Sequence, residues 1–177
     1  APTLPRIDPL EMMIPQGLWG VAGVTVEDDG SFSIADAGEL DPSGPLGDRS
    51  LAGRPFTTWR QFLDAVADRT DPIKLQLTGP ITLGLALVDA GAPVDLAFAV
   101  ASGAVATRAR DLVALAEERA PGVPRVVVFD EPGLVGGRRS ERPLPADQVV
   151  DVLSGALAAI EDGALTGVHV CGPADWR

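Results

Sequence analysis

The chain has 177 residues, and its 25 acidic side chains outnumber its 14 basic ones, which gives a formal net charge of −11 at pH 7. This charge argues against nucleic acids and anionic membrane surfaces as partners, because both are bound mainly through clustered Lys and Arg. Hydrophobic residues make up 46% of the chain, and no uninterrupted apolar stretch is long enough to cross a membrane, so we expect a folded, soluble domain. The single cysteine fits a reducing compartment, and we expect the cytoplasm.

The first third of the chain is predicted to contain little regular structure apart from a β-hairpin. Prolines punctuate residues 1–16, which leaves room for a short extended piece at 4–7 and a helical turn at 10–14. Two β-rich runs within residues 21–34 flank an Asp-Gly turn and predict a hairpin. Residues 35–56 are rich in Gly, Pro and Asp without periodicity, so we expect an irregular loop.

From residue 57 onward, helices and strands are predicted to alternate. Trp59, Phe62 and Val66 follow helical spacing, whereas the β-branched run that ends at Phe129 is typical of a strand covered on both faces. Such alternation indicates βαβ units and a parallel sheet in an α/β fold, either part of a barrel or a small open sheet. The predicted elements are a helix from residue 57, a strand at 73–77, helices at 80–90 and 93–120, a strand at 125–129, a helix at 146–161 and a strand at 166–171.

Candidate functional residues follow the three predicted strands, and the carboxyl ends of parallel strands are where α/β proteins gather such residues. His169 and Cys171 are the only His and the only Cys, and a spacing of two on a strand points both side chains to one face. Imidazole and thiolate together can bind zinc, with at least one further ligand from elsewhere. The alternative is a buried thiol beside an ordinary histidine.

Two acidic residues, Asp130 and Glu131, follow the second predicted strand of the sheet. At a strand end they can act as an acid, a base or an ammonium-binding group, or they can belong to a solvated loop in which the Asp caps a helix. Pro132 favours an extended conformation at the residue before it, so we expect the strand to stop there.

Two further segments have both a structural and a functional interpretation. Thr78-Gly79-Pro80 is predicted to begin a helix, and Gly79 would also allow the backbone to form the wall of a ligand site. Arg138 and Arg139 lie in a Gly-rich loop, where they either hold a carboxylate or phosphate or are simply solvated.

Three segments together resemble the catalytic, C-terminal barrel domain of cobalamin-independent methionine synthase, in the methionine synthase and uroporphyrinogen decarboxylase-like superfamily. They are residues 75–82 (LQLTGPIT), 127–134 (VVFDEPGL) and 167–171 (GVHVC), in the order and spacing of that family. The resemblance covers most of the chain and implies one incomplete domain over 1–177. Its fold would be about half of a TIM-type (β/α)8 barrel with an inserted β-hairpin.

The resemblance also implies a zinc-dependent enzyme that transfers a methyl group to the thiol of homocysteine and makes methionine. The methyl donor would be methyl-folate or a methyl-corrinoid protein. By the same resemblance the zinc ligands would be His169 and Cys171, the catalytic and ammonium-binding residue Asp130, and the other residues near the substrate Glu131, Thr78 and Gly79.

The chain departs from the family pattern at several positions. The acidic motif that helps hold the amino group appears here as Leu-Pro-Arg-Ile-Asp at residues 4–8, and the aromatic residue that stacks on a pterin is replaced by Ala86. The remaining barrel strands and the Cys that completes the zinc site are also missing. We therefore expect an inactive fragment that is completed by additional chain or by self-association.

Three alternatives remain open at the level of sequence. A corrinoid-to-thiol methyltransferase of the same superfamily also carries a His-x-Cys-Gly pattern like that of residues 169–172. A uroporphyrinogen-decarboxylase-like lyase would need no metal. A degenerate barrel fragment would bind or support a partner without catalysis. Zinc content separates the methyltransferases from the other two.

Overall fold

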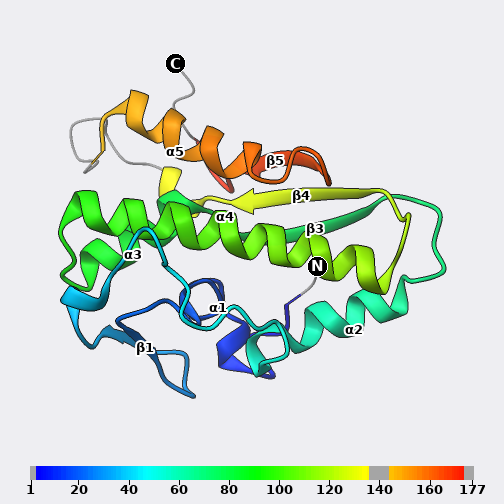
Figure 1. Cartoon of the computed structure of the whole chain (residues 1–177), viewed down its shortest axis with the longest axis horizontal. Coiled ribbons are helices and arrows are strands. Elements are labelled where there is room, and N and C mark those ends of the chain that lie inside the picture. The colour runs from blue at the N-terminus through cyan, green and yellow to red at the C-terminus, as the bar shows by residue number, and fades with distance from the viewer. Residues whose placement is uncertain (1–2, 136–143, 174–177) are drawn as a thin grey trace.

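A computed structural model describes residues 3–135 and 144–173 (Figure 1). It contains a parallel three-stranded sheet with helices and a separate antiparallel hairpin, which confirms the α/β class. The helices and strands are α1 (Met13–Leu18), β1 (Val24–Val26), β2 (Phe32–Ile34), α2 (Thr57–Ala65), β3 (Ile73–Thr78), α3 (Pro80–Asp89), α4 (Val94–Arg119), β4 (Arg125–Asp130), α5 (Ala146–Ala158) and β5 (Leu165–His169).

The sheet has the strand order β3-β4-β5, and both pairs of neighbours are parallel. Each connection between neighbouring strands passes through at least one helix, as the alternation of apolar periods predicts. Within the described residues no further strand pairs with β5 and the sheet does not close on itself. The parallel sheet is therefore confirmed, and the partial barrel stays a prediction.

One face of the sheet is the centre of the hydrophobic core. Leu75, Leu77, Val127 and Phe129 alternate along β3 and β4 with less buried residues and are themselves almost fully buried. They belong to the same apolar cluster as most buried residues of α4, which runs alongside β3 and β4 in Figure 1. Period-two alternation and the packing of α4 thus explain why one face of these strands is buried.

The opposite face of the sheet is more open. Lys74 is exposed, Gln76 and Val128 are partly exposed, and Leu165 at the beginning of β5 has 73% of its surface accessible. Parallel sheets usually have both faces covered, so this face differs from the pattern of a complete α/β domain. The short helix α1 lies against β3, at one edge of the sheet.

Several local predictions are confirmed and two are wrong. The hairpin pairs Val24 with Ile34 inside residues 21–34, and residues 35–56 are irregular apart from two short 3-10 turns. Residues 4–7 form a turn instead of an extended piece, because the amide of Ile7 donates to the carbonyl of Leu4 at 2.8 Å. The last strand ends at His169 instead of Cys171, because its partner β4 ends at Asp130.

The irregular loop is attached to the rest of the fold by Arg108 of α4. This buried guanidinium donates to the backbone carbonyls of Trp19 at 2.7 Å and Arg49 at 3.3 Å and lies 4.6 Å from the centre of the Phe56 ring. Burial lowers the pKa of Arg108 to about 10. Backbone carbonyls and an aromatic face thus replace water around this charge.

Among the residues that the structure describes, no helix combines the length and the apolar character that crossing a bilayer requires.

Candidate functional site

Three of the predicted site residues lie side by side at the carboxyl edge of the sheet. The register pairs Thr78 of β3 with Asp130 of β4, and Asp130 with His169 of β5. Because paired residues of neighbouring strands point to the same face, their side chains share the more open face of the sheet. The convergence expected from the strand order is thus present in the backbone register.

Asp130 and His169 are also in direct side-chain contact. Oδ1 of Asp130 lies 3.0 Å from Nδ1 of His169, and the two side chains are 21% and 52% exposed. The amide Nε2 of Gln76 donates to both oxygens of Asp130, at 3.0 and 2.9 Å. A carboxylate that accepts from Nδ1 leaves Nε2 of the imidazole as the nitrogen with a free lone pair.

Cys171 lies in a bend just after β5 and is an exposed, free thiol. The alternation of the strand nevertheless continues to this residue. Val168 and Val170 pack against the smaller apolar cluster that involves α5, whereas His169 and Cys171 are exposed. The two predicted metal ligands are therefore both directed away from the core, and the interpretation of Cys171 as a buried structural thiol is wrong.

The donor types fit zinc, but they form only part of a site. Imidazole nitrogen and thiolate sulfur are zinc's preferred ligands, and structural or catalytic sites use three or four protein ligands. Among the described residues, no group of three or more His, Cys, Asp or Glu side chains is placed to hold a metal ion. His169 and Cys171 would therefore supply two ligands, and the others must come from outside the described residues.

Glu131 has an environment opposite to that of Asp130. It is fully buried and accepts hydrogen bonds from the amides of Ile81 and Thr82, at 2.9 and 2.7 Å, and from the Thr82 hydroxyl at 2.6 Å. Burial raises the pKa of Glu131, and the hydrogen bond from Thr82 opposes this effect. The interpretation of Glu131 as part of a solvated loop is therefore wrong. Its substrate-binding role stays a prediction, and its carboxylate already accepts hydrogen bonds from three donors.

Thr78 and Gly79 connect the open edge to this buried carboxylate. Pro80 begins α3 directly after them, so the predicted helix start is confirmed. The Thr78 hydroxyl donates to the carbonyl of Met13 at 2.8 Å, and a Cβ at Gly79 would lie 2.2 Å from Oε1 of Glu131. Glycine is thus required because the Glu131 carboxylate occupies the space at the beginning of α3, which also leaves no room there for a phosphate.

A cleft of about 270 Å³ lies beside Asp130. One wall is the end of the sheet and the other is the N-terminal segment around α1. The lining residues are Thr3, Glu11, Met13, Gln16, Gln76, Leu77, Thr78 and Asp130. The cleft thus has both polar and apolar lining, has carboxylates on both walls, and lies directly next to the predicted site residues.

Sequence reasoning missed two residues of this cleft. Gln76 could have been found, because it is a polar residue in an otherwise apolar strand run and lies two positions before Thr78, on the same face. Glu11, in the 3-10 turn Pro9–Glu11, carries no such signal. It is buried and accepts from the amides of Leu4 and Thr58, at 2.7 and 3.0 Å, and from the Thr58 hydroxyl.

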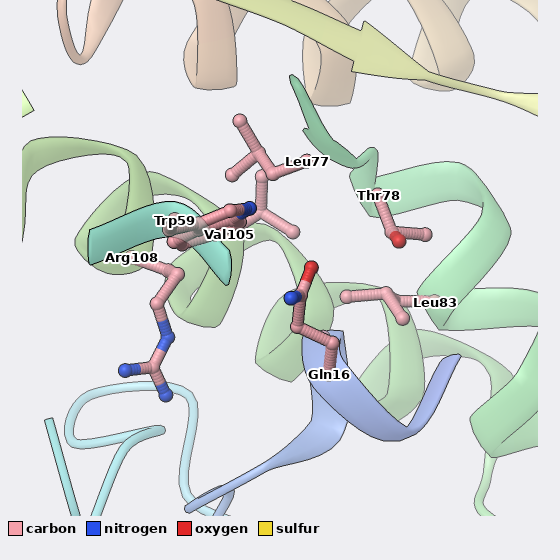
Figure 2. A pocket seen from close by; sticks show the side chains of 8 residues that line it. Gln16, Trp59, Leu77, Thr78, Leu83, Val105 and Arg108 are labelled. Carbon is pink, nitrogen blue, oxygen red and sulfur yellow. The ribbon is translucent and has the colours of Figure 1, made fainter. Parts of the chain in front are cut away.

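A second, much smaller cavity of about 10 Å³ lies deeper in the core, with room for a single water molecule. Figure 2 shows that Gln16, Trp59 and Leu83 reach it from three different helices, with Arg108 at its side. Nε1 of Trp59 and Nε of Arg108 are buried without a hydrogen-bond partner. This cavity therefore lies where the first four helices pack against the end of β3.

Arg138 and Arg139, the candidate anion-binding pair, lie outside the described residues.

Comparison of the chain with known proteins finds no matching family model, no similar curated protein and no similar solved structure. The resemblance of the three motifs to cobalamin-independent methionine synthase stays a prediction. The contacts among Gln76, Asp130 and His169, and the cleft beside them, are the observations that support a function.

Proposed function

We propose that this chain is part of a zinc-dependent methyltransferase that transfers a methyl group to the thiol of homocysteine and makes methionine. The observation that carries the proposal is the contact of 3.0 Å between Asp130 Oδ1 and His169 Nδ1 at the carboxyl edge of the sheet. A carboxylate on the far nitrogen of a histidine is the arrangement that orients metal-binding imidazoles and makes them more basic.

Two side chains of the chain would hold the metal. His169 presents Nε2, because its other nitrogen faces Asp130, and Cys171 presents its thiolate from the same exposed side of the chain end. When bound, zinc lowers the pKa of a coordinated thiol, so that a thiolate nucleophile exists at neutral pH. The remaining ligands come from additional chain or from a second copy.

The substrate would bind in the cleft beside Asp130, with its amino group on that carboxylate. Among the described residues, Oδ2 of Asp130 accepts from Gln76 alone, and a carboxylate oxygen has two lone pairs, so it can also accept from an ammonium group. The cleft of about 270 Å³ is at the small end of the range for ligand sites, which suits an amino acid. Thr78 lines the same cleft, and Gly79 follows it directly at the beginning of α3.

The methyl donor is either methyl-folate or a methyl-corrinoid protein. The partly buried Ala86 of α3 occupies the position of the aromatic residue that would stack on a pterin. Without an aromatic face there, we favour the methyl-corrinoid protein. A free cysteine that must stay reduced and ligated also favours a cytoplasmic enzyme.

Two alternatives compete with this proposal. The described residues supply only two of the expected zinc ligands, so a metal-free lyase of the uroporphyrinogen decarboxylase type and a non-catalytic fragment remain to be tested. A corrinoid-to-thiol methyltransferase would use His169 and Cys171 in the same way and would differ in its thiol substrate.

The proposal is tested by measuring zinc per chain in protein expressed from the complete gene. We expect about one zinc per chain, lost in Cys171→Ser, because that variant removes one of the three or four protein ligands that a zinc site uses. Ser154→Cys, which adds a thiol to an exposed position of α5, is the control and should bind no additional zinc. Zinc-free protein, or zinc that follows the number of exposed thiols, would instead favour the lyase or the non-catalytic fragment.

A further inference from the structure

We propose that Gln76 is a positioning residue for His169. Its amide holds Asp130 as a hydrogen-bond acceptor, and Asp130 in turn holds the imidazole proton on Nδ1, so that Nε2 is the atom offered to a cation. The inference rests on the proposed function only in naming zinc as that cation. The hydrogen-bonded chain itself connects all three strands of the sheet, from β3 through β4 to β5.

The position of Gln76 in the register makes this contact possible. Gln76 is paired with Val128, two residues before the pair of Thr78 with Asp130. Alternation therefore places its side chain on the face that carries Asp130, and a glutamine is long enough to reach forward over one pair. Val128 and Gly167, the residues in register with Gln76 on β4 and β5, have no side-chain polar atom to replace it.

The orientation of the amide follows from the two distances. Nε2 of Gln76 lies 3.0 Å from Oδ1 and 2.9 Å from Oδ2 of Asp130. With the amide turned round, its carbonyl oxygen would face both carboxylate oxygens, and three acceptors would meet without a proton. Gln76 therefore donates, and Asp130 can only accept.

The tautomer of His169 follows in the same way. Oδ1 of Asp130 already accepts from Gln76, and its contact with Nδ1 of His169 at 3.0 Å is a hydrogen bond only when that nitrogen carries the proton. The proton is then absent from Nε2 in the neutral ring. Gln76 reaches the histidine only through Asp130, so it positions the metal ligand without touching metal or substrate.

The test is the imidazole tautomer of His169, read from the nitrogen-15 chemical shifts of the ring. His169 is the only histidine, so its two ring nitrogens give the only imidazole signals of the 177-residue chain. We expect the Nδ1–H form in the unchanged chain. Gln76→Met removes both donors at nearly constant volume and should produce a mixture of the two tautomers. Gln61→Met, at an exposed position of α2, should leave the signals unchanged.

A second readout is zinc affinity, which we expect to fall about tenfold in Gln76→Met, as is typical when a partner behind a metal ligand is lost. Gln76→Thr, which suits a strand, repeats the test if the Met variant does not fold. An Nε2–H tautomer in the unchanged chain, or the same tautomer with and without Gln76, would overturn the inference. A tautomer that depends on Gln76, together with no zinc in protein expressed from the complete gene, would uphold the inference and reject the proposed function.

Discussion

Asp130 and Glu131 are neighbours in the sequence and yet belong to two different regions of the molecule. Asp130 ends β4 on the open face, where it contacts Gln76 and His169 beside a cleft. Glu131 points into the interior and accepts three hydrogen bonds from Ile81 and Thr82 at the beginning of α3. The difference shows that Glu131 fixes the turn after β4, and that Asp130 is presented at the end of the strand directly before that turn.

The N-terminal segment repeats the buried arrangement. Glu11 accepts from the amide and hydroxyl of Thr58 near the beginning of α2, as Glu131 accepts from the amide and hydroxyl of Thr82 near the beginning of α3. Both carboxylates satisfy helix N-terminal amides and face the positive end of the helix dipole. One of these buried glutamates, Glu11, lines the cleft beside Asp130. The other, Glu131, follows Asp130 directly in the chain.

The largest expected effect on stability comes from removing the buried carboxylate of Glu131. Glu131→Leu leaves two amides and one hydroxyl buried without an acceptor, which should lower the free energy of unfolding by about 3 kcal/mol or more. Glu118→Leu, at an exposed position of α4, is the matched control and should change stability little. Denaturant unfolding measures both, and equal effects of the two variants would contradict the structural role of Glu131.

Gly79→Ala should have the next largest effect. The added Cβ would lie 2.2 Å from Oε1 of Glu131, so the capping contact must shift, and we expect a loss of about 1–3 kcal/mol. Gly155→Ala is a control of opposite sign, because nothing lies within 4 Å of that Cβ and alanine favours a helix interior by about 0.5–1 kcal/mol. Thermal unfolding of the two variants should therefore shift in opposite directions.

The pH dependence of stability should report the protonation of the buried Glu131. Burial raises the pKa of Glu131 in the folded chain above the ordinary value of 4.5. The folded state then holds the proton more tightly than the unfolded state, so this contribution is complete below pH 4.5 and is lost as the pH rises through the folded pKa. The stability of the unchanged chain relative to Glu131→Gln should therefore decline as the pH is raised from 4 to 7. A stability difference that stays constant, or that grows with pH, would contradict a raised pKa at Glu131.

The smallest effect on stability is expected at Asp130. Its side chain is partly exposed, so Asp130→Asn should change the free energy of unfolding by only about 1 kcal/mol or less. The same change should weaken zinc binding, because the residue behind His169 is altered. A loss of stability as large as that of Glu131→Leu would remove the contrast between the two neighbours.

The order of strands and helices was predictable because apolar periods of two and of three to four residues alternate clearly from residue 57 onward. The meeting of Thr78, Asp130 and His169 followed from that order, since parallel strands place their carboxyl ends at one edge. The directions of Asp130 and Glu131 were not predictable, because Glu131 leaves the strand with φ −123° and ψ 64°, a turn that no pattern specifies.

The predicted strand to Cys171 was wrong for a reason outside its own sequence. Val168-His169-Val170-Cys171 alternates as a strand would, but a strand needs a partner, and β4 ends at Asp130 before Pro132. The turn at Leu4–Ile7 likewise depends on a local hydrogen bond that competes with the extended form. Pairing partners and local backbone bonds are tertiary information, and periodicity does not report them.

His169 and Cys171 are proposed above all as members of a site that activates a thiol. This role is tested most directly by adding homocysteine to zinc-loaded protein from the complete gene and measuring proton release with a pH indicator in weak buffer. We predict release of about one proton per zinc, because a metal-bound thiol is deprotonated, and none in Cys171→Ser. No release from the zinc-loaded protein, or equal release from the Cys171→Ser variant, would contradict this role.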